Sequence, residues 1–196
     1  MRNKQYYENY IAAFLHENSK VNLISKNDEK FIWEKHIFDS LAIEKFFEKY
    51  QEPTNILDIG TGGGFPAVPI AITYPKINVF AIDSIRKKIN AVNNIKNELN
   101  IENLTTICDR IENINEKFDV VTSRAVASLD KICELALPKL ENGGYFVAFK
   151  SRKTEEEIIS AQKILKKYNS EIIDIIEYTL PLDENFTRNL IIINKK

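Results

Sequence analysis

Apolar and polar positions follow a helical period through the first part of the chain. Over residues 4–17, tyrosine, phenylalanine, leucine and isoleucine recur three to four positions apart, which predicts one amphipathic helix. A second helix is expected to begin at Asn27 or Asp28, because both residue types cap helix N-termini, and to break briefly near residues 36–40. We expect this part, residues 1–53, to form a helical extension that ends before the sheet begins.

Short apolar runs and helical periods alternate through residues 54–196, a pattern typical of an α/β unit with a parallel sheet. Residues 180–187 are too short to carry a parallel crossover, so the last two strands are expected to be antiparallel. We therefore predict an α/β fold with a mostly parallel, doubly wound seven-stranded sheet that ends in an antiparallel hairpin. The expected strands are 55–59, 77–82, 103–107, 118–123, 143–150, 171–179 and 188–194, and the expected helices are 66–73, 84–99, 128–140 and 154–168.

Composition limits the classes of function. With 196 residues and a 44% hydrophobic fraction, the chain can build one sizeable core. A formal net charge of −1 gives no overall basic field, so nucleic-acid binding would need a local basic patch. Two cysteines, two histidines and no CxxC pair predict neither a disulfide scaffold nor a metal site. With no signal peptide and no apolar run near 18 residues, we expect a cytoplasmic protein that does not enter the membrane.

A glycine-rich loop, residues 60–64, follows the first predicted strand and precedes a short helix. Glycine allows positive φ and lets the backbone lie against a ligand, so Gly60, Gly62 and Gly64 are candidate cofactor-binding residues. Phe65 stands where a G-x-G-x-x-G loop has its third glycine, which argues against a bound pyrophosphate. From Asp58 onward the loop resembles the first motif of S-adenosylmethionine-dependent methyltransferases. The alternative is a tight turn that binds no ligand.

Two further strand ends carry candidate polar contacts. Asp83 follows the second strand, where a carboxylate can accept from both ribose hydroxyls of a cofactor; alternatively, it caps the helix that starts near Ser84. Asp109 and Glu112 follow the third strand, where an adenine ring would lie and where they can accept from its amine. As solvated loop charges, the latter pair needs no function at all.

Arg124 ends the fourth predicted strand and is an unusual residue in that position. It either pairs with a carboxylate as a structural element or contacts cofactor or substrate. The motif that holds exocyclic amines in methyltransferases is absent here. Cys108 and Cys133 are poorly placed for the covalent route that pyrimidine C5 chemistry requires. With exocyclic amines and pyrimidine C5 disfavoured, the remaining kind of methyl acceptor is an atom that is already nucleophilic, such as a ring nitrogen.

The motifs together resemble one family, the bacterial small-subunit rRNA guanine-N7 methyltransferases RsmG, also called GidB. The match spans most of the chain, and its most specific part is S-R-A-V-A-S at residues 123–128. The C-terminal hairpin likewise resembles the class I S-adenosylmethionine-dependent methyltransferase fold, with residues 54–196 as the cofactor-binding domain. The other matching segments are residues 22–24, 34–40, 58–69, 83–88, 148–150 and 188–190, with Ser151 where the family has glycine.

The resemblance implies S-adenosyl-L-methionine as cofactor, with contacts at Gly60, Phe65, Ile111, Glu112 and Arg124. It also implies 16S rRNA as partner, with N7 of guanine 527 in the decoding-region 530 loop as acceptor. N7 carries a free lone pair, so no general base is expected. Near-neutral charge suggests that the RNA is presented within the small subunit or an assembly intermediate. The residues expected to position base or phosphate are Arg124, Lys150 and Arg188, with His36 and Lys35 nearby. Local basic clusters at 86–88 and 152–153 are further candidates for phosphate contacts; the alternative is that these clusters are ordinary solvated faces.

Three alternatives share parts of this pattern. A small-molecule methyltransferase would use the same cofactor motifs and fits the near-neutral charge, but it does not explain residues 123–128. An NAD-binding oxidoreductase is disfavoured by Phe65 and by the C-terminal hairpin. A non-catalytic module on the same fold would bind S-adenosylmethionine without turnover.

Overall fold

The computed structural model describes residues 3–50, 52–151, 154–182 and 186–196. The expected basic pair at 152–153 lies outside these residues. None of the helices in the described ranges is both long and apolar enough to span a bilayer.

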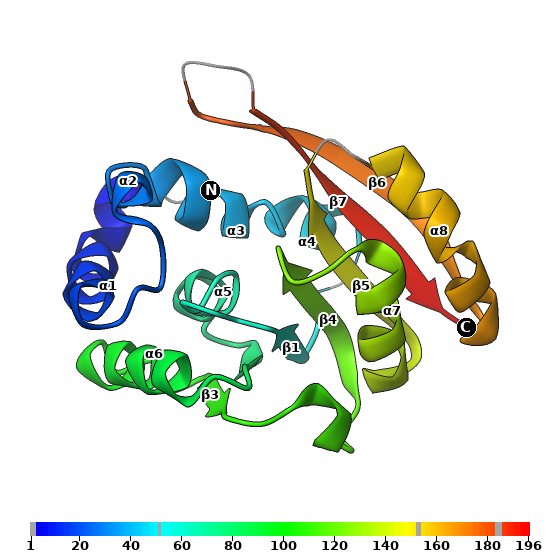
Figure 1. Cartoon of the computed structure of the whole chain (residues 1–196), viewed down its shortest axis with the longest axis horizontal. Helices are drawn as coiled ribbons and strands as arrows, with labels where there is room; N and C mark the ends of the chain where they lie inside the picture. Colours follow the sequence, from blue (N-terminus) through cyan, green and yellow to red (C-terminus); the bar gives the residue numbers. More distant parts are fainter. Residues whose placement is uncertain (1–2, 51, 152–153, 183–185) are drawn as a thin grey trace.

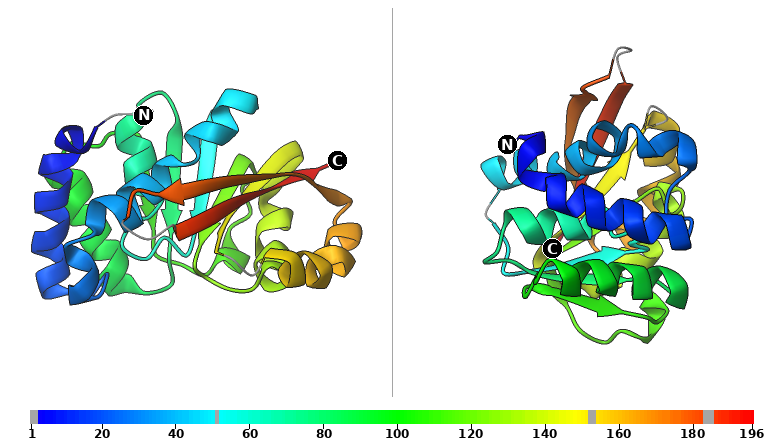
Figure 2. Two further views of the ribbon diagram at one scale, coloured as in Figure 1. Left: turned by 90° about the horizontal axis from the view of Figure 1, so that it is seen from above. Right: turned by 90° about the vertical axis from the view of Figure 1, so that its left-hand side faces the viewer.

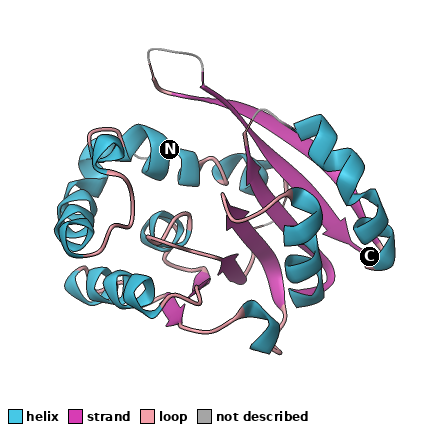
Figure 3. Ribbon diagram, in the orientation of Figure 1, coloured by secondary structure: helices cyan, strands magenta, loops and turns pink. Residues whose placement is uncertain are grey.

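Seven strands form a single sheet within the described residues, in the order β3-β2-β1-β4-β5-β7-β6 (Figures 1 and 3). Every neighbouring pair is parallel except those of β7, which is antiparallel to both β5 and β6. The predicted mostly parallel sheet and the antiparallel final pair are therefore confirmed. The strands are β1 Asn55–Ile59, β2 Asn78–Ile82, β3 Leu104–Ile107, β4 Phe118–Arg124, β5 Leu140–Lys150, β6 Ser170–Leu180 and β7 Phe186–Lys195.

Helices cover both faces of the sheet. Residues from the N-terminal helices, α5 and α6 share one apolar core with one face, and residues from α7 and α8 share a second core with the other. Figure 2 shows α1, α2 and α6 together at one end of the molecule, with α7 and α8 toward the other. Their bounds are α5 Ala67–Thr73, α6 Arg86–Glu98, α7 Leu129–Ala136 and α8 Thr154–Lys167, with 3-10 turns at Ile111–Asn113 and Leu137–Lys139.

The N-terminal extension is helical, as predicted, but it is more segmented. Ser25 caps α2 by accepting from the Asp28 amide, so the expected cap at Asn27 or Asp28 is wrong. The Asp28 carboxylate instead binds the Ser25 hydroxyl and Lys35, so it is not available as a cap. Near the predicted break the chain forms a π-helical turn that leads directly into α3. The elements are a 3-10 turn Lys4–Tyr7, α1 Glu8–Lys20, α2 Lys26–Glu29, the π-helical turn Trp33–Ile37, α3 Phe38–Leu41 and α4 Glu44–Lys49.

Aromatic packing holds the N-terminal helices against the glycine loop. The Phe14 ring of α1 is fully buried and lies 5.0 Å, centroid to centroid, from the ring of Phe65. A Cβ on Gly63 would come within 3.1 Å of the Phe14 ring, so the loop backbone and the helix are in close contact. Burial of such rings contributes on the order of 2–3 kcal/mol each, which favours one fixed position for the helices over the loop.

The order of the strands creates a crevice at the carboxyl ends of β1 and β4. These two strands are neighbours, but the chain continues from β1 to β2 on one side and from β4 to β5 on the other. In open α/β sheets, ligands bind outside the carboxyl ends of the strands at such a point of reversal. The glycine loop after β1 and Arg124 at the end of β4 both lie at this edge.

Candidate functional site

The glycine loop adopts the backbone conformation that its composition predicts. Gly60, Gly62 and Gly64 have φ of +68°, +56° and +91°, which side-chain-bearing residues rarely adopt. A Cβ on Gly60 would also lie 2.6 Å from Cγ2 of Val126, a residue of the loop after β4. Residue 60 therefore needs glycine both for its φ and for the close approach of the two loops.

Asp83 connects the glycine loop to the start of α6. Its Oδ2 accepts from the Gly62 amide at 3.0 Å, and its Oδ1 accepts from the Ile85 amide at 2.8 Å. Ile85 is the N-cap residue of α6 and makes no side-chain capping bond, so Asp83 holds the loop before the helix rather than capping the helix itself. A carboxylate has about four lone-pair sites, so the same side chain retains capacity to accept from two hydroxyls.

A cavity of about 420 Å³ opens beside the glycine loop, between the ends of β1, β2 and β4. We call it the glycine-loop cavity. Of the residues predicted to contact a cofactor, Gly60, Asp83, Ile111 and Glu112 line it. The predicted residues Gly62, Gly64, Phe65 and Arg124 are not part of its lining. The lining also includes Ile59, Ile82, Ser84, Lys88, Asp109, Arg110, Ala125, Val126 and Leu135.

Asp109 has a structural task in the loop that follows β3. Its Oδ1 accepts from the Asn113 side-chain amide and from the Arg110 amide, both at 2.7 Å, and these bonds lower the pKa of the carboxyl. Glu112 lies in the 3-10 turn next to it and is exposed at the rim of the cavity. Of the two carboxylates predicted for this position, Glu112 is therefore the less constrained by the protein.

The side chain of Phe65 is in the core, 4% exposed. It contacts the ring of Phe14, the His36 ring at 5.0 Å and the Arg124 guanidinium carbon at 5.2 Å. Phe65 therefore contributes to the site by packing against the Arg124 guanidinium, in a cation–π contact worth about 1 kcal/mol.

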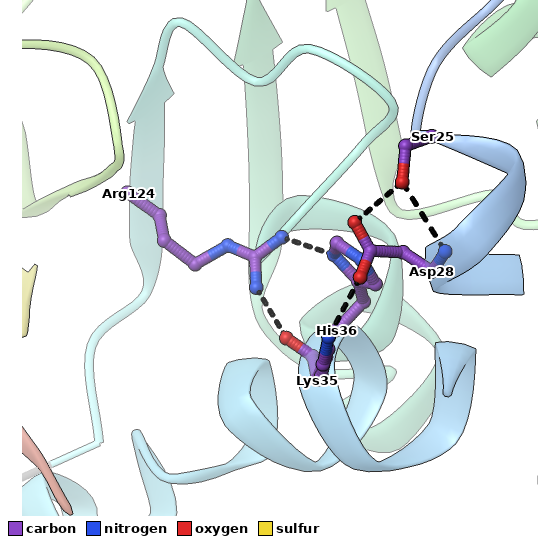
Figure 4. A network of polar contacts seen from close by, with 5 residues as sticks. All are labelled: Ser25, Asp28, Lys35, His36 and Arg124. Carbon is purple, nitrogen blue, oxygen red and sulfur yellow. Dashed lines mark hydrogen bonds and ion pairs between the residues drawn. The ribbon is translucent and has the colours of Figure 1, made fainter. Parts of the chain in front are cut away.

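Arg124 is held by the N-terminal extension (Figure 4). One guanidinium nitrogen donates to the Lys35 carbonyl at 3.0 Å and to Asp39 Oδ2 at 2.9 Å, and the other lies 3.0 Å from His36 Nδ1. The side chains of Arg124 and Asp39 are 15% and 7% exposed. The structural Arg–carboxylate pair that was one alternative for Arg124 is present, so Arg124 joins β4 to the helices that precede the sheet.

Asp39 and Tyr178 complete this network, and sequence reasoning assigned neither a role. The Tyr178 hydroxyl on β6 donates to Asp39 Oδ1 at 2.6 Å, in a buried position. Burial, together with the negative charge of Asp39, raises the pKa of Tyr178 well above its usual value. Asp39 lies within a matching segment and is a polar residue among apolar neighbours, which was a usable signal. For Tyr178 the sequence holds no comparable signal.

His36 is a neutral imidazole in this environment. Burial, and secondarily the positive charge of Arg124, lowers its pKa to about 4. A guanidinium has no acceptor, so Nδ1 accepts from Arg124 and the ring proton belongs on Nε2. His36 Nε2 is buried without a hydrogen-bond partner among the residues that the structure describes.

A second cavity, of about 540 Å³, lies on the other side of the loop after β4; we call it the arginine cavity. Residues from the N-terminal helices and from the β6–β7 hairpin contribute to its lining, and Ala125 lines both cavities. All three residues predicted to position base or phosphate line it, as do Lys35 and His36. The remaining lining residues are Asp28, Asp39, Ala127, Phe149, Ser151, Glu157, Leu180, Leu182 and Phe186.

The three predicted cations differ in how the protein engages them. Lys150 donates to the Ala127 carbonyl at 2.7 Å and pairs with Glu157 Oε2 at 2.6 Å, so it braces the loop after β4. Arg124 is bound to Asp39 as described. Arg188 on β7 has no ion pair among the described residues, and it is the most available of the three for an anionic ligand.

Neither cysteine lines the glycine-loop cavity or the arginine cavity. Cys133 on α7 is fully buried, and burial raises the pKa of its thiol to about 12, which makes it a poor nucleophile at neutral pH. Cys108 is half-buried and lines neither the glycine-loop cavity nor the arginine cavity. Across the described ranges, no group of three or more His, Cys, Asp or Glu side chains is arranged to hold a metal ion.

Comparison with known proteins gives concordant matches. The family model described as rRNA small subunit methyltransferase G (GidB) matches residues 3–180. Proteins named ribosomal RNA small subunit methyltransferase G from Staphylococcus aureus strains RF122 / ET3-1 and JH9 are 37% identical over 198 residues, which covers 98% of this chain and 82% of each relative.

Solved structures with the same fold are methyltransferases. A SAM-dependent O-methyltransferase from Thermotoga maritima has a TM-score of 0.59 at 18% identity, covering 81% of this chain and 64% of that one. A precorrin-6y C5,15-methyltransferase from Geobacter metallireducens has a TM-score of 0.56 at 16% identity, covering 90% and 91%. At this identity the likeness establishes the class I methyltransferase fold alone.

Proposed function

The chain belongs to the RsmG (GidB) family of ribosomal RNA small-subunit methyltransferases, and on this premise we propose that it transfers the methyl group of S-adenosylmethionine to N7 of guanine 527 in 16S rRNA. The observation that carries the proposal is the pair of adjoining cavities that meet at Ala125. One lies against a glycine loop and a strand-end carboxylate, and the other is lined by four cationic side chains, those of Lys35, Arg124, Lys150 and Arg188. Methyl transfer needs such a junction, because donor and acceptor must meet in line.

The glycine-loop cavity fits the cofactor. Positive φ at Gly60 exposes backbone that a Cβ would otherwise cover, and Asp83 keeps lone pairs for the ribose hydroxyls. Ile111 and Glu112 lie where the adenine is expected, with an apolar and a polar side chain respectively. When bound, S-adenosylmethionine supplies an electrophilic methyl group on a sulfonium.

The arginine cavity is the proposed site for the target nucleotide. Its partly buried residues Leu182 and Phe186 offer apolar contact for a base, and Arg188, which has no ion pair among the described residues, offers a cation for a phosphate. Arg124 lies between this cavity and the cofactor side, fixed by three protein contacts. A base must leave its stack to be modified, and this recess gives it a place to bind.

Transfer to guanine N7 needs no general base, because N7 carries a free lone pair. The residues are instead required to align the acceptor and to bear the change in charge. Arg124 and Lys150 are already fixed by Asp39 and Glu157, so little reorganisation is needed when substrate binds. Guanine gains positive charge as its N7 attacks the methyl group and the neutral thioether leaves, so these cations serve to position the nucleotide, and their pairing with Asp39 and Glu157 offsets their repulsion of that charge.

We propose that residues 1–53 act as an extension of the methyltransferase domain at 54–196 and complete the substrate cavity. Lys35, His36 and Asp39 from this extension line the arginine cavity, which supports that role. The exposed Arg86 and Lys87 on α6 are candidates for additional phosphate contacts. An rRNA substrate further supports a cytoplasmic site of action, within the small subunit or an assembly intermediate.

The decisive experiment is to map 7-methylguanosine in 16S rRNA from cells with and without this protein. The proposal requires the modification at guanine 527 to disappear in the deletion strain and to return with the wild-type gene. A modification that persists, or that moves to another nucleotide, would refute the assignment.

Purified protein would then be incubated with subunits and with protein-free 16S rRNA from the deletion strain. Equal activity on both would contradict a structured subunit as the substrate.

A further inference from the structure

Carboxylates in the arginine cavity differ in one respect: whether both oxygens are already engaged. Asp28 uses one oxygen for Lys35 and the other for Ser25, and Asp39 uses one for Arg124 and the other for Tyr178. Each of these carboxylates therefore has both oxygens in hydrogen bonds within the protein.

Glu157 on α8 is different. Its Oε2 receives two donors, the Leu129 amide at 2.8 Å and the Lys150 ammonium at 2.6 Å. Its Oε1 has no partner among the described residues, although the side chain is 27% exposed and lines the cavity. Two donors on one oxygen fix the carboxylate and leave the second oxygen as a preorganised acceptor.

Guanine presents donors on one edge and acceptors on the other. N7 and O6 are acceptors, whereas N1–H and the N2 amine are donors. If N7 faces the cofactor side of the cavity, near Ala125, the donor edge faces the remaining lining residues, which include Glu157 on the first turn of α8. Helix α8 packs beside α7 (Figure 1).

We propose that Glu157 is a specificity-determining residue whose Oε1 accepts hydrogen bonds from the N1–H and N2–H groups of the target guanine. This inference rests on the proposed function, because it requires a guanine in the arginine cavity. It explains how adenine, which also has an N7, is rejected. Adenine N1 is an acceptor and would face a carboxylate that can only accept, so the two acceptors would repel each other and neither would gain a hydrogen bond.

The test is a cycle that combines a protein change with an atomic change in the RNA. Small subunits would be reconstituted with 16S rRNA that carries inosine in place of the target guanosine, which removes only the N2 amine. We expect wild-type kcat/KM to fall about tenfold or more with inosine, the size of one lost base-edge contact. In Glu157→Ala, guanosine and inosine substrates should be methylated at nearly equal, reduced rates.

A matched control is available on the same helix. Glu156 is exposed and does not line the cavity, so Glu156→Ala makes the same chemical change one residue away. It should keep the wild-type rate and the full inosine penalty. If Glu157→Ala does not fold, as judged by cofactor binding, Glu157→Gln keeps the shape with one acceptor oxygen, and the inosine penalty should shrink.

The outcomes separate the two proposals. If wild-type protein does not methylate the guanosine substrate, the proposed function fails and this inference fails with it. If wild type methylates guanosine and inosine equally, only the role of Glu157 is overturned. A full inosine penalty in both Glu157 variants would also overturn it, because a purely structural Glu157 would leave base discrimination unchanged.

Discussion

Breaking the buried Arg124–Asp39 pair should destabilise the protein strongly from either side. Two opposite charges 2.9 Å apart attract by about 6 kcal/mol at an effective dielectric constant near 20, before the loss of hydration is subtracted. Removing one partner leaves the other buried and unpaired, which typically costs about 3–5 kcal/mol. We therefore expect Arg124→Met and Asp39→Asn each to lower the free energy of unfolding by that amount, and to lower Tm by about 6–20 °C.

The double variant decides whether the loss comes from the pair itself. Arg124→Met combined with Asp39→Asn removes both charges, so it should be less destabilised than the sum of the two single variants by 2 kcal/mol or more. Urea unfolding followed by circular dichroism measures all four proteins. The exposed pair Lys167–Glu134, at 57% and 58% exposure, is the control and should show no measurable coupling.

Two results would refute this reasoning. Single variants within 1 kcal/mol of wild type would mean that the pair is solvated rather than buried. Strictly additive losses would mean that Arg124 and Asp39 stabilise the protein through other partners. The result also bears on function, because loss of methylation in an Arg124 variant identifies a catalytic effect only if folding is measured in parallel.

Three further outcomes are expected. Gly60→Ala should weaken S-adenosylmethionine binding tenfold or more, measured by calorimetry. Gly143 also has a positive φ, +82°, but lies in open space away from the site, so Gly143→Ala should leave the affinity unchanged. Equal losses of affinity in the two variants would show that backbone strain alone is responsible. Because the pKa of His36 is lowered to about 4, the unfolded chain binds a proton below about pH 6.5 that the native protein does not bind. The free energy of unfolding should therefore fall by up to about 3 kcal/mol between pH 6.5 and pH 4. His36→Gln should reduce this pH dependence of the urea midpoint. Tyr178→Phe should lose about 1.5–3 kcal/mol by urea unfolding, since it removes a hydrogen bond to the buried carboxylate of Asp39, and a loss below 0.5 kcal/mol would contradict that bond.

Much of the fold could be predicted because its signals are local. Apolar runs bounded by turn residues place β1 and β2 to within a residue, and the helices α5 and α8 were likewise expected. The short link before the last strand correctly predicted an antiparallel pair. The prediction failed at the cap of α2, where Ser25 and Asp28 are both good capping residues. In the structure Ser25 caps the helix, while the Asp28 carboxylate binds the Ser25 hydroxyl and Lys35.

The candidate site was predictable in its composition but not in its connections. Residue types and strand ends indicated Gly60, Asp83 and Arg124, and the family resemblance indicated Lys150. The structure brings Arg124 and Lys150 into the lining of one cavity. It also shows that both are bound by carboxylates that no spacing rule connects to them. Glu157 was one of three consecutive glutamates on a helix until the fold placed it against the loop after β4.

By itself, the sequence determined what can be read within a few residues of any position: the strands and helices, the glycine loop and the acceptor class left open by the missing motifs. Only the tertiary structure decided that β7 inserts between β5 and β6 and that Arg124 is held by Asp39 and Tyr178. Arg124 and Asp39 are 85 residues apart in the chain, and Asp39 and Tyr178 are 139 residues apart. No local period encodes such pairs, because they arise when separate elements bury their apolar faces and leave the enclosed polar groups to satisfy one another.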